Sequence, residues 1–101
     1  MFNNERYITR GIASDISEHI QLALWSFIEI LKLDKNIKVD YLQVFKLRKA
    51  EGNNYNLIIT HSQEEPDYKK VYFVKTDDSV DAKIFVIDDG DHSTMMIASE
   101  Y

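Results

Sequence analysis

A segment in the first third of the chain repeats its apolar residues at the spacing of an α-helix. It covers residues 16–33, and most of its polar residues fall on the opposite side of a helical projection. Asp15 and Glu18 lie three positions apart at its start, which is the spacing of a capping box. We therefore predict one amphipathic helix here. Its apolar face consists of Ile16, Ile20, Ala23, Leu24, Phe27, Ile28 and Leu31.

After the helix the chain changes to a period of two, which indicates β-strands. A short strand is also predicted before the helix, at residues 6–12, because this segment is rich in β-branched and aromatic residues. Gly52-Asn53-Asn54 and Asp89-Gly90 are predicted hairpin turns, and Pro66-Asp67 is a predicted turn opening. The later strands, dense in β-branched and aromatic residues, are predicted at residues 41–49, 55–63, 69–75, 82–88 and 93–99.

These elements give the order β-α-β-β-β-β-β in one α+β domain over residues 1–101. Short connections between consecutive strands cannot form parallel crossovers, so we expect the later strands to form an antiparallel meander. The predicted architecture is a mainly antiparallel sheet of five or six strands. One amphipathic helix packs on one face of that sheet.

Several predicted strands carry apolar residues on both faces. Residues 71–74 and 84–87 are continuous apolar runs instead of alternating ones. One helix cannot cover two faces of a sheet, so part of the second face needs another cover. A curled sheet, the chain termini and a second copy of the chain are the three alternatives, and the last would make the protein a homodimer.

The composition excludes several classes of protein. The chain has no cysteine, which excludes disulfides, thiolate metal sites and cysteine nucleophiles. It contains no run near the ~20 apolar residues of a membrane span, and its start lacks the pattern of a signal peptide. We therefore expect a cytoplasmic protein with no membrane partner. No motif requires a cofactor, and we expect none.

The charge is distributed unevenly along the chain. The net charge is −5, with eight Lys or Arg against six Asp or Glu in residues 1–50, and four against eleven in residues 51–101. Nucleic-acid affinity depends on positive charge, so this balance argues against a nucleic-acid partner. The acidic half is interpreted either as a solvated edge or as a surface for a basic partner. The acidic candidates are Glu64, Glu65, Asp67, Asp88, Asp89 and Asp91.

Two polar clusters are candidates for chemistry. Asp88-Asp89-Gly90-Asp91-His92 gathers carboxylates beside an imidazole, but its spacing matches no calcium loop, and a tight turn explains it more simply. His61 lies three residues before Glu64 and is a candidate general base, although a polar strand end explains this pattern too. The chain has no nucleophile elbow and no glycine-rich phosphate loop. We therefore assign no catalytic residue and no metal ligand, and favour a protein without enzymatic activity.

Basic residues also form small clusters on the predicted strands. Lys46, Arg48 and Lys49 lie on one strand, and Lys69 and Lys70 on another. Such residues are typical of strand edges protected against aggregation. A nucleic-acid site on the sheet surface is the alternative.

The helix supplies a candidate surface for a protein partner. Leu22 and Trp25 fall outside its main apolar arc, and Glu29 lies on the same side. Tryptophan is enriched in binding hot spots, so this surface is a candidate docking site. The alternative is that Trp25 is buried within the chain, against residues 34–40 or against a terminal arm.

Several strings of residues resemble a known family. They are Asn4-Glu5-Arg6-Tyr7-Ile8-Thr9-Arg10-Gly11-Ile12, Asp40-Tyr41-Leu42-Gln43-Val44-Phe45, Gln63-Glu64-Glu65-Pro66-Asp67-Tyr68 and the segment from Val86 to Tyr101. The chain resembles the short proteins of Gram-positive bacteria grouped as domain-of-unknown-function family nine-sixty. That resemblance implies an association with mobile genetic elements, but no activity and no site residue.

Three functions follow as hypotheses. The first is a non-enzymatic protein-binding or accessory module that uses Leu22, Trp25 and Glu29. The second is an acidic inhibitor that imitates DNA. The third is a small hydrolase or metal-dependent enzyme that uses His61, Glu64, Asp88 and His92.

Overall fold

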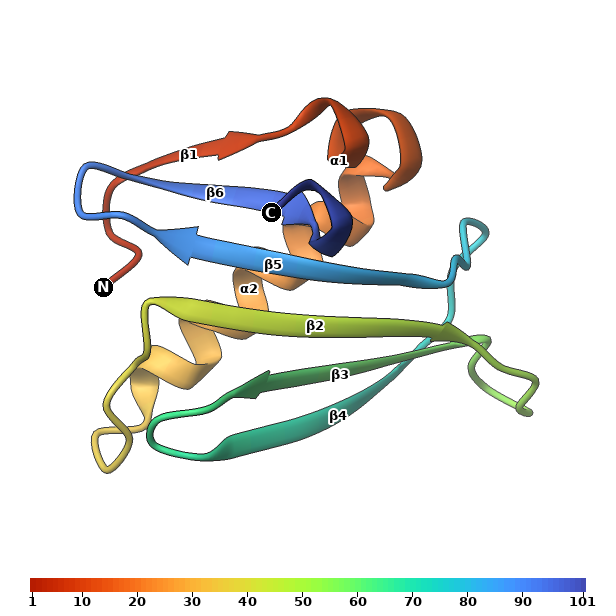
Figure 1. The fold of residues 1–101 in the computed structure, drawn as a ribbon. Helices are drawn as coiled ribbons and strands as arrows, with labels where there is room; N and C mark the ends of the chain where they lie inside the picture. The colour runs from red at the N-terminus through yellow and green to blue at the C-terminus, as the bar shows by residue number, and fades with distance from the viewer.

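The computed structural model describes all 101 residues (Figure 1). Six strands form one sheet, and one long helix lies behind it, so the predicted α+β class is confirmed. The elements are β1 (Glu5–Ile8), α1 (Arg10–Asp15), α2 (Glu18–Leu33), β2 (Leu42–Lys49), β3 (Leu57–Gln63), β4 (Tyr68–Val74), β5 (Ala82–Asp88), β6 (His92–Ile97) and the 3-10 helix η1 (Ala98–Glu100).

The strand order is β1-β6-β5-β2-β3-β4. Every neighbouring pair is antiparallel except β1 and β6, which are parallel. The predicted meander is wrong at one connection, because the chain after β4 returns past β3 and β2, and β5 pairs with β2 (Figure 1). This order places Ile84 and Val86 in the middle of the core, where both are fully buried. The central strands are therefore β2 and β5, and the edge strands are β1 and β4.

The start of the long helix differs from the prediction. A short helix, α1, precedes it, and Thr9 caps α1 by accepting a hydrogen bond from the Ile12 amide. Asp15 therefore ends α1, and α2 begins at Glu18 after Ser17, which makes no side-chain cap bond. The capping box of Asp15 and Glu18 is wrong, because the chain is extended at Ile16 between the two helices.

The segment predicted as a strand at residues 6–12 divides into β1 and α1. Gly11 belongs to α1, where a Cβ atom would lie 2.6 Å from the Glu100 carboxylate. That carboxylate accepts hydrogen bonds from the Thr9 hydroxyl and from the Gly11 and Ile97 amides. Gly11 thus permits a close contact with the end of the chain and forms no β-bulge.

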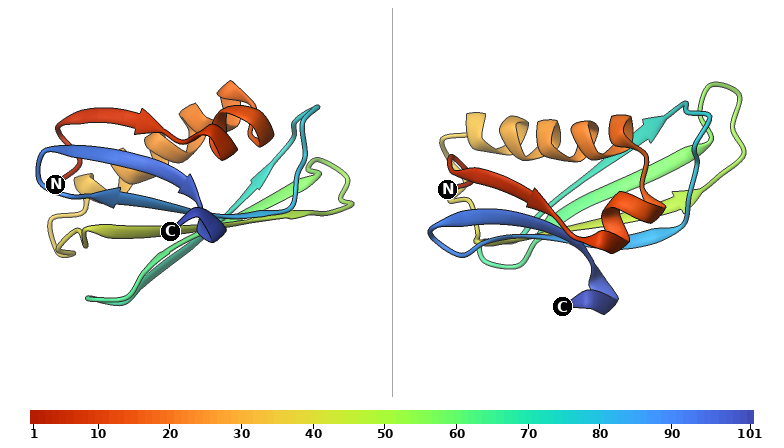
Figure 2. Two further views of the ribbon diagram at one scale, coloured as in Figure 1. Left: turned by 45° about the horizontal axis from the view of Figure 1, so that its top comes forward. Right: turned by 90° about the horizontal axis from the view of Figure 1, so that it is seen from above.

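One face of the sheet and one side of α2 form the core. The helix spans the sheet from β1 to β4, as the two turned views show (Figure 2). At the β4 side, the Phe27 ring stacks on Tyr72 with 3.8 Å between ring centroids. In the middle, Leu24 and Ile28 are fully buried together with Phe45 and Ile59. Alternate residues of β2, β3 and β5 are buried, as expected for strands with one covered face.

The second face of the sheet stays largely open. We call it the open face; it is turned toward the viewer in Figure 1, with α2 behind. Only the end of the chain covers part of it, where the Tyr101 ring meets Phe85 edge-on at 5.7 Å. Of the three predicted covers, a terminus is therefore present, and it covers only the part of β5 around Phe85. Phe73 and Val71 remain 61% and 45% exposed.

Candidate binding groove beside the long helix

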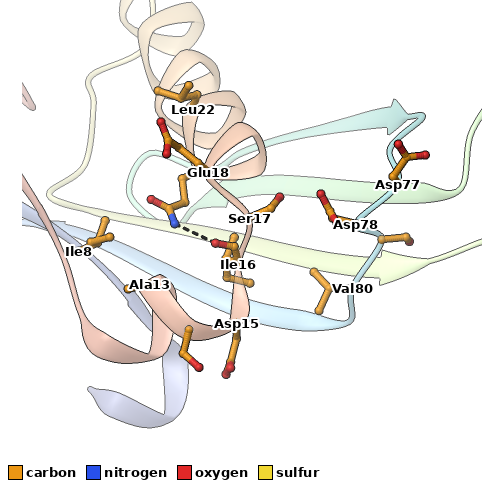
Figure 3. A pocket seen from close by; sticks show the side chains of 13 residues that line it. Ile8, Ala13, Asp15, Ile16, Ser17, Glu18, Leu22, Asp77, Asp78 and Val80 are labelled. Carbon is orange, nitrogen blue, oxygen red and sulfur yellow. Dashed lines mark hydrogen bonds between the residues drawn. The ribbon is translucent and has the colours of Figure 1, made fainter.

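The largest hollow on the surface lies where α1 meets α2. Its second wall is the connection from β4 to β5, so residues about 60 positions apart border one groove (Figure 3). Its volume is about 1000 Å³. Gln21 braces the first wall by donating a hydrogen bond to the Ile16 carbonyl at 2.8 Å. The groove is therefore built from the irregular junction between the two helices, which the sequence pattern did not predict.

Four carboxylates border this groove, and no lysine or arginine does. Asp15 and Glu18 come from the helix junction, and Asp77 and Asp78 from the opposite wall (Figure 3). His19 lies next to the groove, 3.5 Å from Asp78, and its ring also hydrogen-bonds the Thr76 hydroxyl. A concave surface lined by one sign of charge focuses its field and attracts the opposite charge. The groove therefore favours a cationic ligand.

Apolar and hydroxyl groups complete the groove. Leu22 is 62% exposed and Ile8 is 42% exposed, and both border it together with Val80. The Ser17 hydroxyl also borders it and has no hydrogen-bond partner, although its oxygen is buried. A ligand that carries both a cation and an apolar group would match these surroundings.

The predicted surface of Leu22, Trp25 and Glu29 does not exist as one exposed patch. Trp25 is only 8% exposed and belongs to the core, because the guanidinium of Arg6 lies 4.6 Å from its ring. The same guanidinium pairs with Glu29 at 2.8 Å. Burial raises the pKa of Glu29, but Lys32 and Arg6 outweigh burial and leave this pKa below its ordinary value. Trp25 is thus covered by the N-terminal arm, whereas Leu22 and Glu29 stay exposed on either side of it.

The predicted acidic surface is also divided. Glu64, Glu65 and Asp67 are exposed around the β3–β4 turn. Asp89 and Asp91 are exposed in the β5–β6 turn, and β2 lies between the two turns. The predicted acidic residues therefore lie on two separate hairpin turns. The hypothesis of a DNA mimic stays a prediction.

Asp88, which was predicted to belong to the acidic surface, is only 8% exposed. It holds the N-terminal arm in place. Its carboxylate accepts hydrogen bonds from the Phe2 amide at 2.7 Å, the Gly90 amide at 2.8 Å and the Asn4 side chain at 3.0 Å. Burial would raise the pKa of Asp88, but these donors outweigh it and lower the pKa below its ordinary value. The cluster at residues 88–92 is therefore a structural turn. The hairpin forms at the predicted place, but only Gly90 in it has a positive φ, 102°, and the Asp89 amide donates to the His92 carbonyl. Glycine at the first central position is typical of a type II′ turn, whereas an Asp-Gly type I′ turn needs a positive φ at Asp89 too.

The residues of the enzyme hypothesis are not brought together. His61 is fully buried on β3 beneath α2, where Nε2 donates to the Gln43 side-chain oxygen at 2.6 Å and the ring stacks on Phe45. Burial lowers the pKa of His61 to about 4. Its ring makes no ion pair, and His92 pairs instead with Asp89 at 3.2 Å. No group of three or more His, Asp or Glu side chains is arranged to hold a metal ion.

Comparison with known proteins places the chain in a family. A family model described as "Staphylococcal protein of unknown function (DUF960)" matches residues 5–100. The chain belongs to this family. The predicted resemblance is therefore confirmed, and the matched range includes both walls of the groove and the whole sheet.

A solved structure shares the fold of this DUF960 protein. It is described as "Crystal structure of the protein of unknown function from Enterococcus faecalis" and superposes with a TM-score of 0.72. The sequence identity is 22%, and the match covers 97% of this chain and 91% of the other. No functionally curated protein matches the chain. Neither helix is both long and apolar enough to cross a lipid bilayer.

Proposed function

We propose that this DUF960 protein is a non-enzymatic protein-binding module whose groove receives a basic segment of a partner protein. The observation that carries the proposal is the groove between the helix junction and the β4–β5 connection. It is the largest hollow of the surface, it is bordered by four carboxylates without a lysine or arginine, and Leu22 is exposed beside them.

The chemistry of the groove indicates the kind of segment that fits. Lysine or arginine side chains of the partner would pair with Asp15, Glu18, Asp77 and Asp78. One aliphatic side chain of the partner would cover Leu22, which is otherwise exposed to solvent. Opposite charges around a concave site accelerate association and fix the orientation of the partner, whereas the buried apolar contact slows dissociation. An extended or helical segment of a few residues is enough to fill about 1000 Å³.

The test separates the groove from the overall negative charge. A groove variant carries Asp15→Asn, Glu18→Gln, Asp77→Asn and Asp78→Asn. A matched control carries Glu51→Gln, Glu64→Gln, Glu65→Gln and Asp67→Asn, all at exposed positions outside the groove. Each variant has a net charge of −1 in place of −5. Any difference between them therefore reports the position of the charges and not their number.

The measurement is capture from the native host by the wild-type chain, followed by titration of the purified partner against all three proteins. We expect the groove variant to bind the partner at least tenfold more weakly, the control to bind it within about twofold, and Leu22→Ala to dissociate faster. Equal binding by the groove variant and the wild-type chain would disprove the proposal. So would equal weakening of both charge variants, which would mean a general charge effect.

A further inference from the structure

The open face carries a strip of cationic side chains, although the chain as a whole has a negative net charge. Lys46 and Arg48 on β2 alternate with Phe45 and Leu47, which are buried beneath α2, so both cations project from the open face. Lys83 on β5 projects the same way, since its partner in the register is Lys46. Lys69 on β4 faces this side opposite Ser62. None of these four side chains has an ion-pair partner. We call Lys46, Arg48, Lys69 and Lys83 the basic strip.

Edge protection does not explain the basic strip. Lysines on edge strands keep sheets from pairing with other sheets, and Lys69 on β4 fits that role. Lys46, Arg48 and Lys83 lie on β2 and β5, which are the two central strands. Lys46 and Lys83 even occupy directly opposite positions, where like charges repel across a sheet. Lys46 and Lys83 therefore remain on the open face at some cost to the stability of the fold.

Hydroxyl groups and two shallow hollows accompany the basic strip. One hollow, of about 450 Å³, is bordered by Lys46, Lys69, Thr60 and Ser62, with the carboxylates of Glu64 and Asp67 at its rim. A smaller one, of about 160 Å³, lies between Lys46, Arg48, Thr60 and Ile58. Lysine, arginine, serine and threonine are the side chains that commonly contact the phosphates of a nucleic acid.

Aromatic rings flank the basic strip on the same face. Phe73 is 61% exposed at the β4 edge, and Tyr55 meets its ring edge-on at 5.0 Å. Tyr101 is 75% exposed next to Phe85, and the Lys83 ammonium lies 5.6 Å from the Phe85 ring. Exposed rings beside cations are the arrangement on which unpaired bases stack.

We propose that the open face binds single-stranded nucleic acid, with phosphates along the basic strip and bases on the flanking rings. A symmetric second copy is disfavoured, because a twofold axis through the strip would oppose Lys46 and Lys83 to themselves. A nucleic acid is favoured over a protein partner, because the cations are accompanied by hydroxyl groups and exposed rings, which together match phosphates and bases. The inference is independent of the groove, which is bordered by none of these residues.

The proposal revises the expectation drawn from net charge. The carboxylates are concentrated in turns and in the groove. A phosphate that approaches the open face would therefore lie closer to the cations of the basic strip than to most of the carboxylates. The net charge of −5 still repels a polyanion at long range, so binding is weak and needs low salt. Because each neutralised phosphate contributes about −0.7 to the slope of log K against log salt, four contacts predict a slope of about −3.

The experiment titrates fluorescein-labelled ten-nucleotide oligo-dT and oligo-U with the whole protein between 20 and 200 mM NaCl, followed by anisotropy. We expect both to bind, with slopes near −3, and Lys46→Gln with Lys83→Gln to reduce the slope to about −1.5. Lys35→Gln with Lys38→Gln is the matched control, since both are exposed lysines outside the strip and outside the α2 and β2 bounds. The control should keep the wild-type slope. Phe73→Ala should weaken binding about tenfold.

Three results would overturn the proposal. The first is no anisotropy change for either oligonucleotide at 20 mM NaCl. The second is an equal loss of binding in the control pair, which would mean attraction to lysine in general. The third is displacement of the oligonucleotide by polyglutamate at equal charge concentration, which would assign the face to an acidic protein. The groove variant described above should bind oligonucleotides at least as well as the wild-type chain, so the two proposals fail separately.

Discussion

The buried imidazole of His61 makes the stability of the fold depend on pH. The ring lies under α2 and makes no ion pair, and only Nε2 has a partner, the Gln43 side-chain oxygen. The bare Nδ1 would have to accept a proton in an apolar environment. Burial accordingly lowers the pKa of His61 from 6.5 to about 4. The unfolded chain then binds the proton first, so stability is fully present above pH 6.5 and is lost as the pH falls toward 4.

The magnitude follows from the two pKa values. With 6.5 for the unfolded chain and about 4 for the folded one, the free energy of unfolding should fall by about 2 kcal/mol between pH 7.5 and pH 5. Carboxylates whose pKa is lowered in the fold, such as Asp88, lose their contribution mainly below pH 4. The interval from pH 7.5 to 5 therefore isolates the histidine term from the acidic residues.

The assay is urea unfolding at pH 7.5 and pH 5 for the wild-type chain and for His61→Phe. The substitution keeps a ring against Phe45 and removes the titrating group, so its own cost cancels in the comparison across pH. We expect the wild-type chain to lose about 2 kcal/mol more than the variant over this interval. An equal loss in both proteins would refute the argument. If the variant does not fold, an NMR titration of the His61 ring in the wild-type chain tests the same argument. A pKa of 6 or higher for His61 would refute the argument.

Four further substitutions test the core, the surface and the turns. Trp25→Ala should lower the free energy of unfolding by about 3–5 kcal/mol, because the indole is buried, whereas Leu22→Ala at an exposed position should change it by less than about 0.5 kcal/mol. Urea unfolding followed by circular dichroism measures both values. A similar cost for the two substitutions would contradict the burial of Trp25. Asp88→Asn should cost about 1–3 kcal/mol and speed hydrogen exchange at the Phe2 amide; unchanged exchange would contradict its anchoring role. Gly90→Ala should lower thermal stability by about 1 kcal/mol, and a neutral result would contradict the need for positive φ.

The elements that the sequence predicted well are those with a long, regular hydrophobic pattern. The long helix was predicted to within two residues, because Ile20, Leu24, Phe27, Ile28 and Leu31 all face the sheet. The five later strands lie where the period of two indicated. The spacing of apolar residues along a helix or strand depends only on which side of that element is buried. It can therefore be read from the sequence without knowing how the elements are arranged in the fold.

The order of the strands in the sheet could not be predicted from the hydrophobic pattern. Nothing local to β5 shows that it pairs with β2, since the choice depends on burying Ile84 and Val86 at the centre of the sheet. The six residues of α1 were missed because residues 6–12 are rich in β-branched and aromatic residues, which favour a strand. The signal that could have revealed α1 was Thr9, a good N-cap residue three positions before Ile12.

The sites needed contacts across long sequence separations. Trp25 fell outside the apolar arc of α2 and is nevertheless buried, because its cover is the Arg6 guanidinium from another element. The groove combines Asp15 and Glu18 with Asp77 and Asp78, and no spacing rule connects the two pairs. The cations of the open face were visible in the sequence, but their central position depends on strand order.

The parallel pairing of β1 with β6 has a consequence for how the protein is made. Glu5 finds its partner only when His92 has been synthesised, which at roughly 5–20 residues per second is several seconds after β1 has left the ribosome. Until then β1 has no partner strand, since it lies at the edge of the sheet and pairs only with β6. β1, and with it the Arg6 guanidinium that lies over the Trp25 ring, can therefore take its place only after the last strand has been made.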